Sequence, residues 1–136
     1  MYVIDASVFI KWVVAEDDSD KALMVWQQAR ADRTSMAAPD LLLYETGNIL
    51  VRKKGFEVQD VKRTIRLLIE SDIDIRPLNT ALILQAVEMA DATGCSVYDG
   101  TYLALTRELN GTLVTADRRL AELGSSVADV RLLAAF

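Results

Sequence analysis

The sequence predicts an α/β protein in which helices flank a central parallel sheet of about four to five short strands. Two observations predict this fold class. Short apolar runs, such as residues 2–4 and 112–115, alternate with longer segments of helical periodicity, such as residues 58–71. In addition, 136 residues with 51% hydrophobic side chains supply enough material for one packed core. We therefore expect a single domain over residues 1–136.

The first strand is expected at residues 2–4, an apolar run that ends in an acid. Residues 6–15 are apolar nearly all round, which favours a buried helix, and residues 19–30 repeat apolar side chains at helical spacing. A second strand is expected at residues 34–38, directly before Pro39. A strand, helices and a second strand in this order favour parallel pairing.

Two helices, at residues 40–54 and 58–71, are expected to meet at Gly55. The second of them has an apolar stripe, which is typical of a helix that packs one face against its neighbours. We expect the two helices to form a hairpin outside the sheet. A third strand follows at residues 74–78.

The last third of the chain continues the alternation, and Gly94 and Gly111 each end a helix. In chain order its expected elements are a helix at 80–92, a helix at 96–109, a strand at 112–115, a short helix at 118–123 and an edge strand at 130–133. Strands separated by helices favour a parallel sheet that is covered on both faces.

The composition argues against several classes of protein. A net charge of −5 and a pI near 4.7 disfavour binding of nucleic acid through a broad basic surface. The absence of histidine excludes hydrolases with a histidine base and the zincins. No apolar run approaches the ~18 residues of a membrane span, and no secretory leader is evident, so no membrane contact is expected. With Cys95 as the single cysteine, we expect a cytoplasmic protein without a disulfide.

Asp5 and Asp117 each stand where an expected strand ends and a helix begins. In parallel sheets this edge is where ligands bind, so the two carboxylates are candidates for one site. The alternative is that each carboxylate only caps its helix, because aspartate accepts the free N–H groups of a first helical turn.

Asp99 and Glu45 are the other candidate acids. Ser96 and Asp99 also fit a capping box, so a structural role stays open for Asp99. Glu45 lies among core-forming side chains, where an unpaired carboxylate needs a cation, hydrogen-bond donors or a raised pKa. The alternative for Glu45 is a polar helix face on which it pairs with Asn48 and Arg52.

The four acids together favour a hydrolase that binds divalent metal ions. Carboxylates without histidine are the ligands that hard ions such as Mg²⁺ and Mn²⁺ prefer. In two-metal hydrolysis one ion activates the attacking water and the other stabilises the leaving oxygen. Such a site would leave coordination positions for a phosphate group.

Four segments that together span the chain carry a family resemblance. They are YVIDAS at 2–7, PDLLLYETGNIL at 39–50, SVYDGTYLALTREL at 96–109 and TLVTADRRL at 112–120. On these segments the chain resembles the PIN-domain ribonucleases, in particular the VapC-type toxins of toxin–antitoxin pairs. The resemblance implies a PIN-like fold with the first strand beside strand 112–115. The site residues that it implies are the catalytic and metal-binding acids and their polar neighbours, namely Asp5, Glu45, Asp99 and Asp117, with Ser7, Thr115 and Asn48.

The resemblance implies a metal-dependent endoribonuclease that cleaves RNA with Mg²⁺ or Mn²⁺ and leaves a 5′-phosphate and a 3′-hydroxyl. It also implies a homodimer and a small cognate antitoxin whose tail presents a basic residue to the acids. The nearest candidates for RNA contact are the basic residues Lys11, Arg52, Lys53, Lys54, Arg118 and Arg119.

Two further positions have local interpretations. Gly100 stands where the family more often has alanine, and we expect it to weaken the first turn of its helix by up to ~1 kcal/mol relative to alanine. Asp40 follows Pro39, and we expect it to cap a helix and not to bind metal.

Two other functions remain open. An aspartate after a first strand is also the nucleophile of phosphoaspartate enzymes, although no second acid lies near Asp5 and no lysine follows a later strand in the receiver-domain manner. A PIN-like module without catalysis would only bind RNA or a protein partner. The presence of all four acids argues against that loss.

Overall fold

Five strands form one parallel sheet. The computed structural model describes residues 1–136 and has the strand order β3-β2-β1-β4-β5. The strands are β1 (Tyr2–Ile4), β2 (Met36–Pro39), β3 (Ile73–Arg76), β4 (Thr112–Thr115) and β5 (Val130–Leu132). Every strand pairing is parallel, and β1 lies beside β4. The predicted α/β class is confirmed, with five strands in the sheet.

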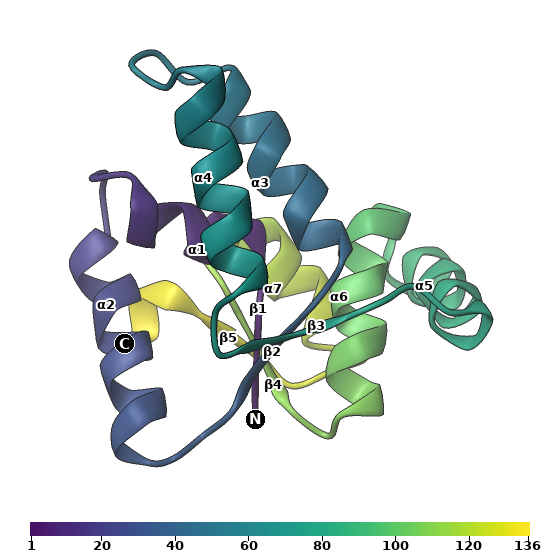
Figure 1. Ribbon diagram of the computed structural model, residues 1–136. Helices are drawn as coiled ribbons and strands as arrows, with labels where there is room; N and C mark the ends of the chain where they lie inside the picture. Colours follow the sequence, from purple (N-terminus) through teal and green to yellow (C-terminus); the bar gives the residue numbers. More distant parts are fainter.

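Helices cover both faces of this sheet. They are α1 (Ala6–Val13), α2 (Ser19–Ala31), α3 (Leu41–Val51), α4 (Val58–Ile69), α5 (Thr80–Thr93), α6 (Val97–Glu108) and α7 (Arg118–Gly124), followed by the 3-10 helix η1 (Leu133–Ala135). Figure 1 shows α1 and α2 on one side of the strands and α5 and α6 on the other. Parallel strands need such crossover helices, because a tight turn cannot join them.

The two central strands supply the middle of both cores. Val3 of β1 and Leu113 of β4 are partners in register and belong to the core beneath α5, α6 and α7. The next pair, Ile4 and Val114, enters the core beneath α1 and α2. All four side chains are fully buried, which explains why these strands are apolar on both faces.

The order of the strands creates a switch point between β1 and β4. From β1 the chain moves outward to β2 and β3, and it then returns to the opposite side of β1 for β4 and β5. Crevices at such switch points, outside the carboxyl ends of the strands, are where ligands bind in parallel sheets. Asp5 directly follows β1, and Asp117 follows β4 after a single intervening residue.

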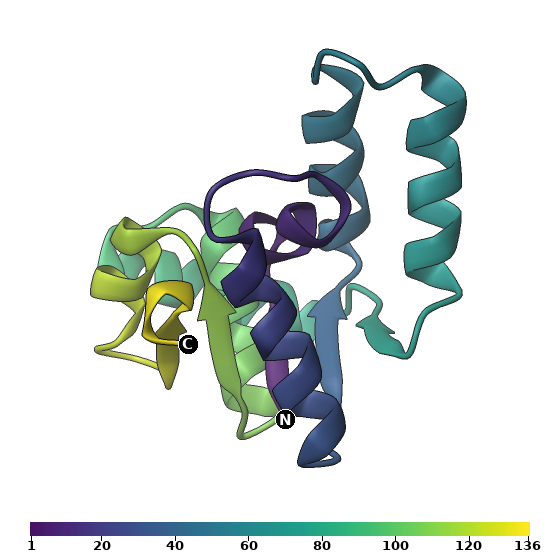
Figure 2. The same ribbon diagram turned by 90° about the vertical axis from the view of Figure 1, so that its left-hand side faces the viewer.

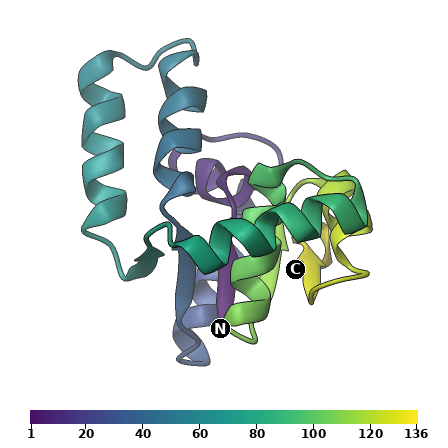
Figure 3. The same cartoon turned by 90° about the vertical axis from the view of Figure 1, so that its right-hand side faces the viewer.

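The helices α3 and α4 form the predicted hairpin. Figures 2 and 3 show them side by side and extending beyond the end of the sheet. Gly55 turns the chain between them with a φ of 93°, a left-handed conformation that glycine adopts without strain. A capping box formed by Glu57 and Asp60 starts α4. Glu45 lies in the first half of α3, the half nearer to the sheet.

Several element ends differ from the prediction. β2 begins at Met36 and not at residue 34, and it includes Pro39 as its last residue. β3 covers residues 73–76 and not 74–78, because it pairs in register with β2 from Met36–Ile73 to Pro39–Arg76. The predicted last strand ends at Leu132, after which the chain enters η1.

Two local interpretations are corrected. Asp40 precedes α3, but its carboxylate does not cap that helix and accepts a 3.0 Å hydrogen bond from the backbone N–H of Leu78. It therefore ties the start of α3 to the segment after β3. A Cβ atom on Gly100 would overlap the backbone carbonyl oxygen of Ala86 in α5. Glycine is thus required for the close packing of α6 on α5, whatever its intrinsic cost in a helix.

Candidate active site

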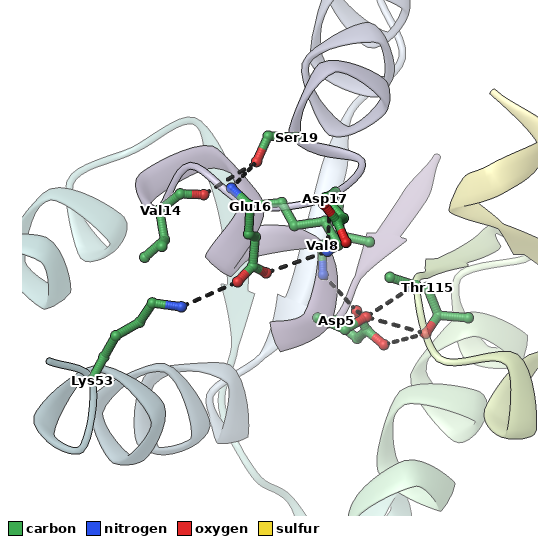
Figure 4. Close-up of polar contacts among 11 residues, drawn as sticks. Asp5, Val8, Val14, Glu16, Asp17, Ser19, Lys53 and Thr115 are labelled. Atoms are coloured by element: carbon green, nitrogen blue, oxygen red, sulfur yellow. Dashed lines mark hydrogen bonds and ion pairs between the residues drawn. The ribbon is translucent and has the colours of Figure 1, made fainter.

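Asp5 is a buried carboxylate with three hydrogen-bond donors. It occupies the N-cap position of α1 and is 5% exposed. Its Oδ1 accepts bonds from the hydroxyl of Ser7 (2.6 Å) and the backbone N–H of Val8 (3.1 Å). Its Oδ2 accepts a 2.5 Å bond from the hydroxyl of Thr115 at the end of β4 (Figure 4). Asp5 therefore caps its helix, as one alternative predicted, and also faces the switch point.

The buried position of Asp5 controls its charge. Burial raises the pKa of Asp5 to about 6, and the bonds from Ser7, Thr115 and Val8 oppose that rise without cancelling it. The nearby carboxylate of Asp117 adds to the rise. At neutral pH the group is ionised at a cost, so a bound cation would stabilise it.

The two hydroxyls also tie β4 and α7 to the start of α1. Thr115 Oγ1 accepts the backbone N–H of Asp117 (3.0 Å), and Ser7 Oγ accepts that of Ala116 (2.8 Å). Each hydroxyl therefore bonds to Asp5 on one side and to the backbone of the β4–α7 turn on the other. Asp117 is exposed and caps α7 through a 3.1 Å bond from Leu120 N–H. Asp117 therefore caps α7, as one alternative predicted, and lies beyond the end of β4, while its role as a site residue stays a prediction.

Glu45 faces the other acids and has one donor. The hydroxyl of Tyr102 in α6 donates a 2.5 Å hydrogen bond to Glu45 Oε2. Burial raises the pKa of Glu45, the bond from Tyr102 opposes the rise, and the charges of Asp5 and Asp99 add to it. These charge interactions bring Asp5, Glu45 and Asp99 into one electrostatic group. Asp117 joins this group through Asp5.

Asp99 lies in the first turn of α6 and is half-buried. The hydroxyl of Ser96 accepts its backbone N–H at 3.0 Å, as the predicted capping box requires. No return bond joins the Asp99 carboxylate to the backbone of Ser96, so only half of the box is present. The Asp99 carboxylate is therefore not used by the cap.

Tyr102 was not predicted as a site residue. The sequence feature that could have indicated it is its position three residues after Asp99, which places both side chains on one face of a helix. Burial raises the pKa of Tyr102, and Glu45 raises it further, so the hydroxyl keeps its proton and acts as a donor. The predicted alternative partners of Glu45, Asn48 and Arg52, are exposed and make no hydrogen bond or ion pair with it.

The donor set suits a hard divalent cation. The acids near the switch point are all carboxylates, and none of the ion pairs in the structure neutralises them with a lysine or arginine. Burial also disfavours the negative charge of Asp5, and a bound cation would offset this unfavourable free energy. The spacing of the acids differs from that of an assembled metal site, because no three of the protein's Asp, Glu, Cys or His side chains lie close enough together to hold one ion.

Two of the predicted RNA-contact residues are engaged elsewhere. Glu16 accepts Lys11 at 3.3 Å through one oxygen and Lys53 at 3.2 Å through the other, which links the α1–α2 loop to the end of α3 (Figure 4). Burial opposes the charged form of Glu16, but the two lysines outweigh it and lower the pKa of Glu16. The remaining candidates are exposed, namely Arg52, Lys54, Arg118 and Arg119.

An apolar groove of about 570 Å³ lies apart from the acids, between α1, α2 and α4. Trp12, Leu23 and Leu67 are among its lining residues, and Leu23 and Leu67 are more than half exposed. The groove is a surface for apolar side chains and includes none of the four acids. None of the helices in the fold is long and apolar enough to cross a membrane.

The comparisons with known proteins agree with this fold. A family model of the PIN domain matches residues 2–125. Ribonuclease VapC3 from Pyrobaculum aerophilum is 32% identical over 124 residues, which cover 88% of this chain and 92% of that protein. Among solved structures, FitAcB from Neisseria gonorrhoeae has a TM-score of 0.77 at 10% identity and full coverage of both chains. VapC20 from Mycobacterium tuberculosis, described as a sarcin-ricin loop cleaving toxin, has a TM-score of 0.77 at 16% identity, over 96% of this chain and 99% of its own. The matched family model, the relative and the shared fold show that this chain belongs to the PIN domain family.

Proposed function

We propose that this protein is a metal-dependent endoribonuclease and the toxin of a VapBC-type toxin–antitoxin pair. The observation that carries the proposal is the buried carboxylate of Asp5 at the switch point, whose charge is coupled to that of the other acids and has no cationic side chain beside it. The relative named Ribonuclease VapC3 supports RNA as the substrate. We assign residues 1–136 to one nuclease domain.

In this proposal Asp5 and Asp99 are the principal ligands of Mg²⁺ or Mn²⁺, and Glu45 and Asp117 complete the site directly or through water. The ion, when bound, supplies a Lewis acid that lowers the pKa of water and stabilises charge on the phosphate. Without a cation, the four carboxylates would repel the negatively charged RNA backbone. The acids therefore require the ion both for their own charge balance and for substrate binding.

The supporting residues keep the acids in place. Ser7 and Thr115 hold both oxygens of Asp5 and keep it aligned with the carboxyl end of β4. The same hydroxyls fix the turn that carries Asp117. Asn48 is exposed one helical turn after Glu45, a position suited to hydrogen bonding with RNA. Asp5 and the turn that carries Asp117 are thus held in place before any substrate binds.

The proposed partners are RNA, a cognate antitoxin and a second copy of the chain. A structure of similar fold, solved as a toxin–antitoxin complex from Klebsiella pneumoniae, supports the antitoxin. The apolar groove between α1, α2 and α4 is a surface on which a segment of such a partner can bury apolar side chains. An acidic site also suits a basic residue of an inhibitor. A single cysteine and an RNA substrate are consistent with action in the cytoplasm.

The decisive experiment compares RNA cleavage by the wild type, Asp5→Asn and Asp99→Asn. We expect the wild type to cleave single-stranded RNA with Mg²⁺ or Mn²⁺ and to lose this activity in a chelator. Both variants are expected to be inactive although folded. Asp91→Asn, which changes an exposed aspartate of α5, is the matched control and should keep full activity. Full metal-dependent cleavage by a cleanly folded Asp5→Asn or Asp99→Asn protein would contradict the proposal.

The second candidate is a PIN-like module that binds RNA or protein without cleaving it. It is favoured by the spacing of the acids, because no three of them are close enough to share one ion as they stand. Titration calorimetry separates the two functions. If the wild type binds Mg²⁺ or Mn²⁺ below millimolar concentration and Asp5→Asn does not, the result supports the enzyme. If the wild type binds neither ion, the non-catalytic binding module is the function that remains.

A further inference from the structure

Tyr102 connects the core of the domain to the candidate site. Its ring is part of the apolar core beneath α5, α6 and α7, and the residue is 2% exposed. Its hydroxyl, however, leaves the core and donates to Glu45 Oε2 at 2.5 Å. The bond joins α6 to α3, two helices that are far apart in the sequence.

The two oxygens of Glu45 are in different situations. Oε2 accepts the Tyr102 hydroxyl, whereas Oε1 has no hydrogen-bond donor and no ion-pair partner in the protein. Asp5 differs, because donors from Ser7, Val8 and Thr115 occupy both of its oxygens. Glu45 therefore has one oxygen held by the protein and one that is available to a ligand.

The donor of this bond is fixed more firmly than its acceptor. The Tyr102 ring is enclosed by core side chains, so the position of its hydroxyl follows from the packing of α6. Glu45 has three rotatable side-chain bonds and stands on α3, the first helix of the protruding hairpin. Without the bond, its carboxylate would be free to adopt several rotamers, and ordering it again would cost conformational entropy.

We propose that Tyr102 is a positioning residue whose buried hydroxyl holds Glu45 Oε2 and so presents Oε1 to the metal ion of the candidate site. This inference rests on the proposed function, because it requires that Glu45 helps to bind an ion. Residues that orient metal ligands typically change metal affinity by about 10–100-fold when they are mutated. Tyr102 would act in this way through Glu45, without touching the ion or the RNA.

The test is titration calorimetry of Mn²⁺ with the full chain and the variant Tyr102→Phe, which keeps the ring and removes the hydroxyl. We expect the affinity to fall by about 10-fold or more. Tyr98→Phe is the matched control, because Tyr98 lies four residues earlier on α6, is 64% exposed and has no hydrogen bond to lose. Its Mn²⁺ affinity should equal that of the wild type. In a Glu45→Ala background, Tyr102→Phe should cause no further loss, since the residue that it positions is gone.

The outcomes separate this inference from the proposed function. If Tyr102→Phe binds Mn²⁺ as tightly as the wild type while Asp5→Asn does not, the positioning role is refuted and the metal site stands. An equal loss with and without Glu45 would also refute it, because Tyr102 would then act by another route. A wild type that binds no Mn²⁺ refutes both.

A measurement on the wild type guards against a variant that fails to fold. The hydroxyl proton of Tyr102 is buried in a short bond to a carboxylate, so it should give a slowly exchanging downfield NMR signal. Saturation with Mg²⁺, which is diamagnetic, should shift this signal, because charge is withdrawn from Glu45. A signal that is unchanged by saturating Mg²⁺ would overturn the proposal.

Discussion

Replacing Asp5 with asparagine is expected to stabilise the ion-free protein above about pH 6 while it abolishes metal binding. The pKa of Asp5 is about 6 in the folded state, against an ordinary value of 3.8. Below about pH 4 both the folded and the unfolded chain keep the proton, so the side chain costs nothing there. Between about pH 4 and 6 the unfolded chain releases its proton first, and the free energy of unfolding falls as the pH rises.

Above about pH 6 the loss of stability is constant. At 1.36 kcal/mol for each pH unit between the two values, it amounts to about 3 kcal/mol. Asparagine has nearly the same shape and no charge to bury. The variant and the wild type should therefore be about equally stable near pH 4, and the variant should be more stable by up to about 3 kcal/mol near pH 8.

Urea unfolding in a chelator, at steps from about pH 4 to about pH 8, measures this difference. Asp91→Asn serves as the control, because its carboxylate is exposed, and its stability should follow that of the wild type at every pH. A difference between Asp5→Asn and the wild type that does not change with pH would refute the reasoning. So would a variant that is less stable than the wild type near pH 8. Added Mg²⁺ should raise the stability of the wild type and of Asp91→Asn, but not that of Asp5→Asn.

Three further substitutions test other parts of the structure. Gly100→Ala should lower the free energy of unfolding by about 1–3 kcal/mol in urea, because its Cβ would overlap the carbonyl oxygen of Ala86; increased stability would show that helix propensity dominates. Thr115→Val removes a donor from the buried Asp5 carboxylate and should destabilise the protein at pH 7 by about 1–3 kcal/mol, with a smaller effect near pH 4, where Asp5 is protonated. Glu16→Gln should destabilise the protein slightly at neutral pH, where the ionised Glu16 pairs with Lys11 and Lys53. Below the pKa of Glu16 in the folded protein the carboxylate is protonated, so the variant and the wild type should be equally stable there, and unfolding midpoints measured against pH check this.

The strands β1 and β4 and the acids that follow them could be predicted because they depend on local patterns, whereas only the family resemblance implied that the two strands are neighbours. The runs at β1 and β4 are apolar on both faces, and Asp5 and Asp117 follow them closely, so the sequence alone indicates two strands with acids at one edge. The ends of β2 and β3 could not be predicted in this way. Their limits follow from the register between Met36 and Ile73, which is a property of the assembled sheet.

The partner of Glu45 depends on tertiary structure in the same manner. From the sequence, the carboxylate of Glu45 in α3 is expected to need a cation, hydrogen-bond donors or a raised pKa, and Asn48 and Arg52 are the partners at helical spacing. The donor is instead Tyr102, which is 57 residues away and reaches Glu45 only once α6 has packed on the sheet. Local spacing cannot predict such a contact.

Gly100 shows the limit of intrinsic propensity as a guide. Its helix would be expected to gain stability from alanine at this position, since glycine is a poor helix former. The backbone of Ala86 lies where the methyl group would go. Glycine is required here because α6 packs closely on α5, and a single sequence does not show how closely two helices pack.

The pairing of β1 with β4 has a consequence for the synthesis of the chain. Asp5 leaves the ribosome well before its donor Thr115, which lies 110 residues later in the chain. A nascent or prematurely terminated chain that ends before β4 contains Asp5, Glu45 and Asp99 and yet has no strand to complete the site. Pairing between such distant segments also forms late in folding. The proposed nuclease is therefore inactive until β4 has been made and has paired with β1.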